Sequence, residues 1–316
     1  MSHAKLSVVM ANYNHAHYLP GAIEAVLGQT RPADEFLILD DASTDSSIEI
    51  IASYAARHPV IRFLRNPANL GVVGAHRRLF EESTGDYVCT IAADDRHLPR
   101  YYERGMELAE RHPQAGIIFG KVGIIDEADR ELAVLGVRRW QNSGYFTPEQ
   151  FRREYLEVEA PSHSLSAATI FRRDAFAEVG WYPPDLGSWS DTFALRAIGL
   201  KHGACYINET VTRWRRSTAS FSGKSRANPR HTLDLVARAA RLMRSGEFRD
   251  RFPEEHVHRW ERDYRRLVMW NAWQGEGLGF RPKTVGFWLN FCKRLPKLPA
   301  ALRLAFYRPP QDDGAT

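Results

Sequence analysis

The sequence has few cysteines and no long apolar run, and both absences restrict the classes of protein to consider. No apolar run among its 316 residues approaches the length of about 20 that a membrane-spanning helix needs. Its three cysteines, Cys89, Cys205 and Cys292, lie far apart without a CxxC pattern, which favours reduced thiols. The first residues lead into a strand pattern without the apolar segment of a signal peptide, so we expect a cytoplasmic protein.

The sequence also lacks a glycine-rich loop of the kind that cradles phosphate groups, because the GVVG stretch at residues 71–74 is too short for one. It has instead two acidic clusters, each directly after a short apolar run. Residues 36–39 (FLIL) precede the DDASTD cluster at residues 40–45, and residues 87–91 (YVCTI) precede the AADD cluster at residues 92–95. Acidic groups at two strand exits suggest a site for a metal-bound, phosphorylated ligand.

The reason is electrostatic. Continuous apolar runs of this length indicate strands that are covered on both faces, as in a parallel sheet, and ligands of such sheets lie beyond the carboxyl ends of the strands. Carboxylates crowded at one crevice repel each other, and a divalent cation or a donor-rich ligand relieves that repulsion. The alternative for residues 40–45 is a turn and a helix cap, since Asp and Ser favour both places.

The alternation of strand and helix patterns predicts an α/β protein with a layered, largely parallel sheet. Strands are expected at residues 6–10, 36–39, 61–64, 87–91, 116–119 and 167–172. Helices are expected at residues 19–27, 74–83, 99–111 and 191–199, and after a capping-box pattern formed by Ser46 and Glu49. The periodicity fades over residues 135–161, which we interpret as a loop near the site.

The net charge of +5 conceals an asymmetry between the two ends of the chain. Residues 1–130 carry 13 Lys and Arg against 18 Asp and Glu, whereas residues 131–316 carry 30 against 20, a net charge of +10. Residues 231–275 are Arg-rich with a helical pattern, and residues 277–311 contain seven basic residues and no acid. The aromatic and basic tail fits a peripheral contact with an anionic membrane, or a helical appendage packed on the main domain or on a second subunit of a homodimer.

Six segments in a specific order and spacing support a family resemblance. They are VVMANYN with HYLPGAIEAVLGQT, LDDASTDSS, NPANLGVVGA, TGDYVCTIAADD, FRRDAFAEVGWYPPDLGSWSDTFALRA and RWRRSTASFS. Over residues 5–220 the chain resembles the family 2 glycosyltransferases, nucleotide-sugar-dependent enzymes of the GT-A fold. The resemblance implies a GT-A domain at residues 1–222, with a Rossmann-like, mostly parallel sheet flanked by helices, and a basic helical extension at residues 223–316.

The resemblance also implies a donor site made from the two acidic clusters. Tyr13 would pack on the base of the nucleotide, and Asp41 would accept a hydrogen bond from an imide nitrogen, which suits a uracil-like edge. Asp40 would help to position the nucleoside, and Asp94 would reach the ribose. Asp95 would hold the Mg²⁺ or Mn²⁺ ion that bridges the pyrophosphate and stabilises the departing nucleoside diphosphate.

Three further positions follow from the same resemblance. Asp191 matches the general base that takes the proton of the acceptor hydroxyl during a single, inverting displacement. The alternative for Asp191 is a helix N-terminal residue stabilised by the helix dipole. Arg77 or Arg78 would contact the donor, and we select Arg78. Trp189, in a turn beside Asp191, is the candidate for covering the apolar face of an acceptor sugar.

The chain departs from the family pattern at several positions. Ser190 stands where the family often has Glu, and Ser217 stands where it often has a His that can join the metal shell. The triplet at residues 75–77 reads Ala-His-Arg in place of Ala-Arg-Asn. Ser217 and the altered triplet are also expected in a catalytically silent nucleotide-sugar-binding or scaffold protein, but the intact Asp41, Asp95 and Asp191 argue against it.

We therefore expect a metal-dependent, inverting glycosyltransferase. Its donor would be a nucleotide sugar, with a UDP-sugar favoured, and its acceptor a hydroxyl of a glycan or of a lipid-linked saccharide in surface polysaccharide biosynthesis. Nucleic acid is not expected as a partner, because the Arg-rich residues 213–266 contain no nucleic-acid-binding module pattern.

Overall fold

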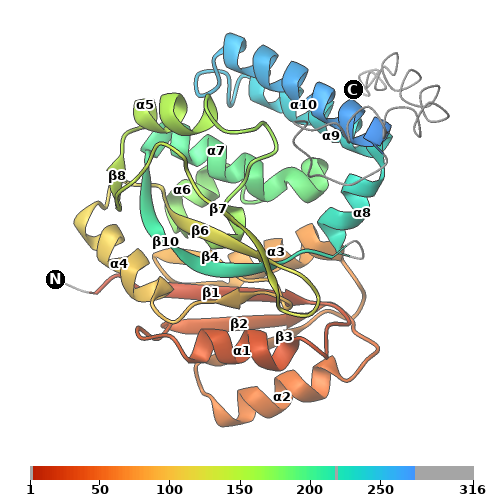
Figure 1. Cartoon of the computed structure of the whole chain (residues 1–316). Helices are drawn as coiled ribbons and strands as arrows, with labels where there is room; N and C mark the ends of the chain where they lie inside the picture. Colours follow the sequence, from red (N-terminus) through yellow and green to blue (C-terminus); the bar gives the residue numbers. More distant parts are fainter. Residues whose placement is uncertain (1–2, 218–219, 275–316) are drawn as a thin grey trace. The chain divides into compact units, whose positions relative to one another are not determined.

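The structure is a computed structural model in which residues 3–217 and 220–274 are described. The chain divides into two compact units, residues 1–217 and residues 218–316 (Figure 1). The first unit contains every residue that the sequence predicts for the site, and each unit is described by itself below.

The first unit alternates strands and helices from its start. Its strands are β1 (Leu6–Asn12), β2 (Glu35–Asp40), β3 (Ile61–Arg65), β4 (Tyr87–Thr90), β5 (Arg96–His97), β6 (Ile117–Ile125), β7 (Glu131–Leu135), β8 (Gly144–Phe146), β9 (Thr169–Arg172) and β10 (Ala204–Arg215). Its helical segments are α1 (Leu19–Leu27), α2 (Ser47–Arg57), α3 (Gly71–Glu82), α4 (Tyr101–Arg111), α5 (Pro148–Gln150), η1 (Phe151–Leu156), η2 (Ser166–Ala168), α6 (Arg173–Glu178), η3 (Pro184–Trp189) and α7 (Ser190–His202).

These strands form one sheet in the order β3-β2-β1-β4-β9-β6-β10-β5, with β7 beside β6 and β8 beside β10. The strands β3, β2, β1 and β4 run parallel, as do β6 and β10, whereas β9 pairs antiparallel with both β4 and β6. Figure 1 shows α1 and α2 against one face of the β1–β3 part of the sheet and α3 on the other. The predicted α/β class is therefore confirmed, with antiparallel pairing added by β5, β7, β8 and β9.

The sheet places the two acidic clusters at one edge. Asn12, the last residue of β1, pairs with Asp40, the last residue of β2, and Asp40 in turn pairs with Arg65 at the end of β3. On the other side of β1, strand β4 ends at Thr90, and the N–H of Ile91 still donates to Val9 O at 3.0 Å. The residues that follow β1, β2, β3 and β4 consequently leave the sheet in the same direction, as a parallel arrangement requires.

The interpretation of residues 135–161 as a loop is wrong in part. This stretch contains β8, α5 and the π-helix η1, and it is held by buried aromatic side chains. The Trp140 ring stacks on Phe146 with their centroids 3.8 Å apart, and Phe151 and Tyr155 pack edge to face at 5.1 Å. An irregular spacing of large aromatics can build a compact core without a helical or strand period, because each ring buries much apolar surface.

The start of α2 also differs from its sequence pattern. The helix begins at Ser47 as expected, but Ser46 makes no side-chain cap bond, so the expected capping box with Glu49 does not form. Instead Asp45 Oδ1 accepts the Ser47 N–H at 3.0 Å. The side chain that caps a helix need not be the residue directly before it, since any nearby acceptor can satisfy the free N–H groups.

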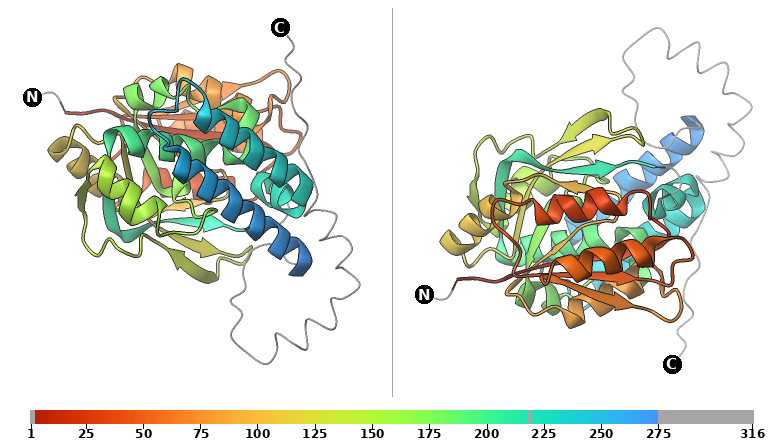
Figure 2. Two further views of the ribbon diagram at one scale, coloured as in Figure 1. Left: turned by 90° about the horizontal axis from the view of Figure 1, so that it is seen from above. Right: turned by 90° about the horizontal axis from the view of Figure 1, so that it is seen from below.

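The second unit is helical in its described part. It contains α8 (Phe221–Ala227), α9 (Pro229–Arg244) and α10 (Glu254–Gln274), and Figure 2 shows α9 and α10 side by side. Leu233 and Val268 form the buried contact between the two helices. The expected helical stretch thus breaks between Arg244 and Glu254. The aromatic and basic tail lies outside the described residues, and within them no helix is both long and apolar enough to cross a membrane.

Candidate active site

The Asp40 carboxylate organises the loop at the end of β2. Its Oδ2 accepts a hydrogen bond from Asn12 Nδ2 at 2.9 Å, and its Oδ1 accepts the Ser43 N–H at 2.9 Å. Asp40 is fully buried, so any help that it gives a nucleoside passes through the loop that it shapes. This turn-forming role is the alternative that the sequence left open, and it is compatible with a binding site beside it.

The Asp41 carboxylate holds the beginning of α3. It accepts hydrogen bonds from Asn66 Nδ2 at 2.6 Å, from the Leu70 N–H at 2.9 Å and from the Gly71 N–H at 2.9 Å. A carboxylate is favourable here because the free N–H groups and the dipole of a helix make its N-terminus positive. Gly71 has a φ of 74°, which a residue with a side chain rarely adopts. Contact of Asp41 with a base stays a prediction.

Arg78 reaches this cluster through Asn66. Its Nη1 donates to the Arg65 carbonyl at 2.8 Å and to Asn66 Oδ1 at 2.5 Å, and the Asn66 amide nitrogen then donates to Asp41. The three side chains therefore form a relay from the surface of α3 to the buried acid. The contact of Arg78 with the donor stays a prediction.

Tyr13 is the exposed side chain of the same edge, with 45% of its surface accessible. The loops around it are tied together, because Asn14 donates its N–H to Ser43 Oγ at 2.9 Å and accepts the Thr44 N–H on its Oδ1 at 2.8 Å. Asn14 and Ala42 have positive φ angles of 56° and 64°, an uncommon conformation that these bonds maintain. A flat aromatic ring on a rigid loop is well suited to stacking on a base.

The second acidic cluster is held by Arg215, the last residue of β10. Asp95 Oδ1 accepts the Arg215 main-chain N–H at 2.8 Å, and the Asp94 carbonyl accepts a hydrogen bond from Arg215 Nε at 3.1 Å. Both acids are buried, Asp94 at 9% exposure and Asp95 at 4%. Burial and the neighbouring Asp94 carboxylate raise the pKa of Asp95 well above its usual value. A cation at this place would relieve that electrostatic cost.

Arg215 itself is a buried cation with several partners. Its Nη1 donates to the Asp126 carbonyl at 2.7 Å, its Nη2 pairs with the exposed Asp129 carboxylate, and its guanidinium carbon lies 4.7 Å from the centre of the Tyr18 ring. Arg215 therefore joins the second acidic cluster to the turn after β6 and to the residue that precedes α1. Arg215 lies in the segment RWRRSTASFS, which supports the family resemblance, but no role was predicted for it from the sequence.

The residues at this cluster fit a divalent cation only with help from a ligand. No group of three or more His, Cys, Asp or Glu side chains that could hold a metal alone occurs among the described residues. Ser217, which replaces the family's His, donates instead to Glu127 at 2.9 Å. Asp95 keeps one carboxylate oxygen that no described residue occupies with a hydrogen bond. One protein carboxylate together with the oxygens of a diphosphate is a coordination set that Mg²⁺ and Mn²⁺ accept.

Asp191 lies in the first turn of α7 and is enclosed by hydrogen-bond donors. Its Oδ2 accepts from Ser166 Oγ at 2.7 Å, and its Oδ1 accepts the Thr192 N–H at 2.6 Å. Burial raises the pKa of Asp191 from its ordinary value, while these donors act in the opposite direction. A general base is most effective when its pKa lies near the working pH, so a raised pKa suits a carboxylate to this role near neutral pH. The helix-start position and a basic role are therefore compatible.

Helix α3 connects the first acidic cluster to Asp191. Its first N–H binds Asp41, and His76, five residues further along, interacts electrostatically with Asp191. At a rise of about 1.5 Å per residue, that separation corresponds to about 7.5 Å along the helix axis. Tyr182, which also interacts with Asp191, has its hydroxyl 3.4 Å from Thr90 Oγ1 at the end of β4. Asp191 is thus related to the Asp41 edge of the sheet through His76 of α3, and to the end of β4 through Tyr182.

Trp189 offers little surface to a ligand. It is 8% exposed, and the guanidinium carbon of Arg196 lies 5.2 Å from the centre of its ring. Phe193 packs beside it at a centroid distance of 6.4 Å. Contact with an acceptor sugar stays a prediction, and in this conformation the ring is largely buried.

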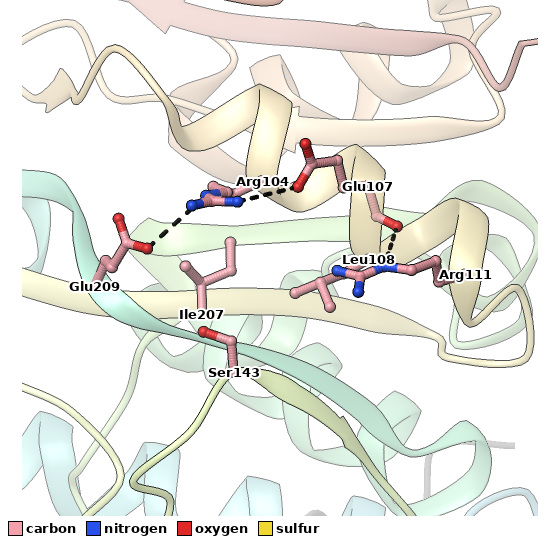
Figure 3. A pocket seen from close by; sticks show the side chains of 7 residues that line it. All are labelled: Arg104, Glu107, Leu108, Arg111, Ser143, Ile207 and Glu209. Atoms are coloured by element: carbon pink, nitrogen blue, oxygen red, sulfur yellow. Dashed lines mark hydrogen bonds and ion pairs between the residues drawn. The ribbon is translucent and has the colours of Figure 1, made fainter.

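A separate cavity of about 190 Å³ lies between α4 and β10 (Figure 3). Its lining is formed by Arg104, Glu107, Leu108, Arg111, Ser143, Ile207 and Glu209. The charged groups in it pair with each other, with Arg104 3.3 Å from Glu107 and 3.8 Å from Glu209. None of the predicted site residues borders this cavity, so it is not part of the candidate active site.

The comparison with protein families decides the classification. The model of the family described as "Glycosyl transferase family 2" matches residues 7–180, a stretch that includes both acidic clusters and most of the sheet. The chain belongs to this family. The resemblance predicted from the sequence motifs is confirmed, and the region beyond residue 180, with Asp191 and Arg215, lies outside the matched stretch.

Relatives of known sequence agree with this classification. The uncharacterised glycosyltransferase YibD of Escherichia coli is 40% identical over 204 residues, which is 63% of this chain and 58% of YibD. The putative glycosyltransferase EpsE of Bacillus subtilis is 31% identical over 124 residues, covering 39% of this chain and 45% of EpsE. The chain thus matches about half the length of these relatives.

Solved structures share the fold at low sequence identity. The Staphylococcus aureus TarS fragment 1–349 in complex with UDP-GlcNAc has a TM-score of 0.66 and 14% identity, over 95% of this chain and 82% of the fragment. The mannosyltransferase PcManGT of Pyrobaculum calidifontis, in complex with GDP-Man and Mn²⁺, has a TM-score of 0.58 and 17% identity, over 96% and 85% of the two chains. These likenesses establish the GT-A type fold.

Proposed function

We propose that this protein transfers a sugar from a nucleotide donor, with a UDP-sugar favoured, to a hydroxyl of a glycan or lipid-linked acceptor. The transfer inverts the anomeric configuration and depends on Mg²⁺ or Mn²⁺. A place in cytoplasmic surface-polysaccharide biosynthesis, with the basic tail at the membrane or in a dimer contact, is part of the proposal. The observation that carries it is that α3 binds Asp41 at its first residue and, through His76 near its middle, interacts with the Asp191 carboxylate.

In this proposal each part of the site has one task. Tyr13 packs on the base, and the loop ordered by Asp40 and Asp41 receives the nucleoside. Asp94 reaches the ribose. Asp95 would be the protein ligand of the metal, which neutralises charge on the departing diphosphate when it is bound. The UDP, UDP-GlcNAc, and GDP-Man with Mn²⁺ bound by proteins of the same fold support the choice of ligand class.

The chemical step is a single displacement. The acceptor oxygen forms a bond to the anomeric carbon while the bond from that carbon to the diphosphate oxygen breaks, and the electron pair leaves with the nucleoside diphosphate. Asp191 accepts the proton of the acceptor hydroxyl. Its raised pKa, caused by burial, makes it a stronger base than an exposed aspartate.

A thermal-shift experiment tests the metal-dependent nucleotide site. We expect UDP to raise the melting temperature only with Mn²⁺ or Mg²⁺, because the diphosphate and Asp95 must share the cation. A ligand at one hundred times its Kd stabilises a fold by about 2.7 kcal/mol, which is readily measured. The D95A variant should lose the shift, whereas D86A, which removes an exposed acid that accepts the Lys5 N–H, should keep it.

An equal UDP shift in the presence of a chelator would contradict the metal assignment. Release of free nucleoside diphosphate from one of a set of nucleotide sugars then distinguishes an enzyme from a silent binding protein. A protein that binds UDP with metal but turns over no nucleotide sugar in the presence of varied glycan acceptors would support the scaffold alternative.

A further inference from the structure

Three hydroxyl groups form a chain that ends on the Asp191 carboxylate. Thr192 Oγ1 lies 2.9 Å from Ser164 Oγ and 3.2 Å from Asp191 Oδ1, so it can donate its one proton to either. Ser164 Oγ donates to Ser166 Oγ at 3.1 Å, and Ser166 Oγ donates to Asp191 Oδ2 at 2.7 Å. Ser166 is 8% exposed and Thr192 is 5% exposed, so these two hydroxyls are largely shielded from water, whereas Ser164 is partly exposed. Ser164 and Ser166 precede β9, whereas Thr192 follows Asp191 on α7, so the chain connects two separate elements.

The direction of this chain follows from its chemistry. A hydroxyl has one proton to donate, and an ionised carboxylate can only accept. Ser166 must therefore donate to Asp191, and the Ser166 oxygen is then free to accept the proton of Ser164. Successive donors polarise one another in a low-dielectric interior, so the last hydroxyl becomes a stronger donor than an isolated serine. The short distance of 2.7 Å to Asp191 agrees with a charge-assisted bond.

The other groups that face Asp191 carry no charge near neutral pH. His76 approaches from α3, where its Nδ1 donates to the Val72 carbonyl at 2.8 Å, and burial lowers its pKa. Tyr182 approaches from the segment before η3, and burial raises its pKa. The hydrogen bonds from Ser166 and Thr192 therefore favour the ionised form of Asp191 more than its charge interaction with His76 does.

We propose that Ser166 is a positioning residue for the general base: through the hydroxyl chain it fixes the orientation of the Asp191 carboxylate and keeps it ionised for proton transfer. This inference rests on the proposed function, because it assigns Asp191 the role of base. Ser166 does not touch the reacting atoms in this scheme. It determines which lone pairs of Asp191 stay available to the acceptor hydroxyl, since one lone pair of Oδ2 is already occupied.

The test compares S166A with S166T in the dependence of kcat on pH. Removing the donor disfavours the ionised carboxylate, so the acidic limb of the profile should move to higher pH. Relative to the wild type, the kcat of S166A should then be reduced about ten times more at pH values below the midpoint of the acidic limb than at pH values above it. S166T keeps a hydroxyl and should restore the wild-type position of the limb. The H76Q variant should leave the displacement caused by S166A unchanged, which excludes titration of His76 as its source.

A uniform loss of kcat at every pH, with no displacement of the limb, would overturn the proposal and leave Ser166 a structural residue. If S166A does not fold, S164A carries the test one step further along the chain, and we expect a smaller displacement in the same direction. The D191N variant distinguishes this outcome from a failure of the proposed function. If Asp191 is not the general base, D191N keeps wild-type turnover. In that case the acidic limb belongs to another group.

Discussion

Replacement of Asp191 by asparagine is expected to lower kcat for sugar transfer by a factor of about 10² to 10⁴, the usual contribution of a positioned general base. The amide keeps the shape of the side chain but cannot accept the proton of the acceptor hydroxyl. Binding of the nucleotide should be unchanged, since Asp41 and Asp95 are untouched. The measurement is steady-state release of nucleoside diphosphate together with the Kd for UDP in the presence of Mn²⁺.

Asp174 provides a matched control for this variant. It lies in the first turn of α6 as Asp191 lies in the first turn of α7, and its side chain is 74% exposed. D174N should therefore keep wild-type kinetics. Wild-type turnover by D191N would remove Asp191 from the mechanism, whereas an equal loss in both variants would point to a general effect on the helices rather than on proton transfer.

The same substitution has an expected effect on stability that depends on pH. Because burial raises the pKa of Asp191, the unfolded chain ionises first as the pH rises past about 3.9, and folding becomes less favourable for the wild type. Asparagine cannot ionise. D191N should accordingly melt at a higher temperature than the wild type at pH 7, and the two melting temperatures should converge near pH 3. A lower melting temperature for D191N at pH 7 would contradict this account.

The second large effect is expected at Arg215. Exchange for methionine should lower the free energy of unfolding of the first unit by about 2 to 5 kcal/mol, because it removes the donors of two main-chain carbonyls and the buried cation beside Asp95. Methionine approximates the length of the side chain, so loss of packing is small. Denaturant unfolding followed by tryptophan fluorescence measures the difference.

R213M is the control for that experiment, since Arg213 lies on the same strand two residues earlier and its side chain is exposed. It should change the free energy of unfolding by less than about 0.5 kcal/mol. Equal unfolding midpoints for R215M and R213M would mean that the contacts of Arg215 add nothing to stability. R215M should also weaken metal-dependent binding of UDP, because it removes the donor to the Asp94 carbonyl and the positive charge that favours ionised Asp95.

The site residues that could be predicted from the sequence are those that lie directly at the carboxyl end of a strand. A buried apolar run followed by Asp is visible in one sequence, and the parallel register of β1 and β2 then places Asp40 beside Asn12. The same reasoning, applied to the run at residues 61–64, could have found Asn66, which follows β3 and donates to Asp41. Asn66 is the first residue of the segment NPAN, but an amide at a strand exit is less specific for a binding site than a carboxylate.

Other partners could not be predicted because they are remote in the sequence. Arg215 and Asp95 are 120 residues apart, and Ser166 and Asp191 are 25 apart. Strand β10, which supplies Arg215, was not predicted either, because its middle contains register shifts between Ile207 and Thr212 that interrupt the alternation of side chains. Contacts of this kind follow from the pairing of strands, which a pattern within one segment does not reveal.

The position of α3 has a consequence for how this protein could diverge. One rigid helix carries the Asp41-bound N–H of Gly71 at its start and His76 near Asp191 further along. Inserting or deleting one residue between them would rotate the later part of the helix by about 100° and remove His76 from its place. Evolution towards other donors would then have to proceed by exchanging side chains or reshaping loops, while the length of this helical segment is conserved.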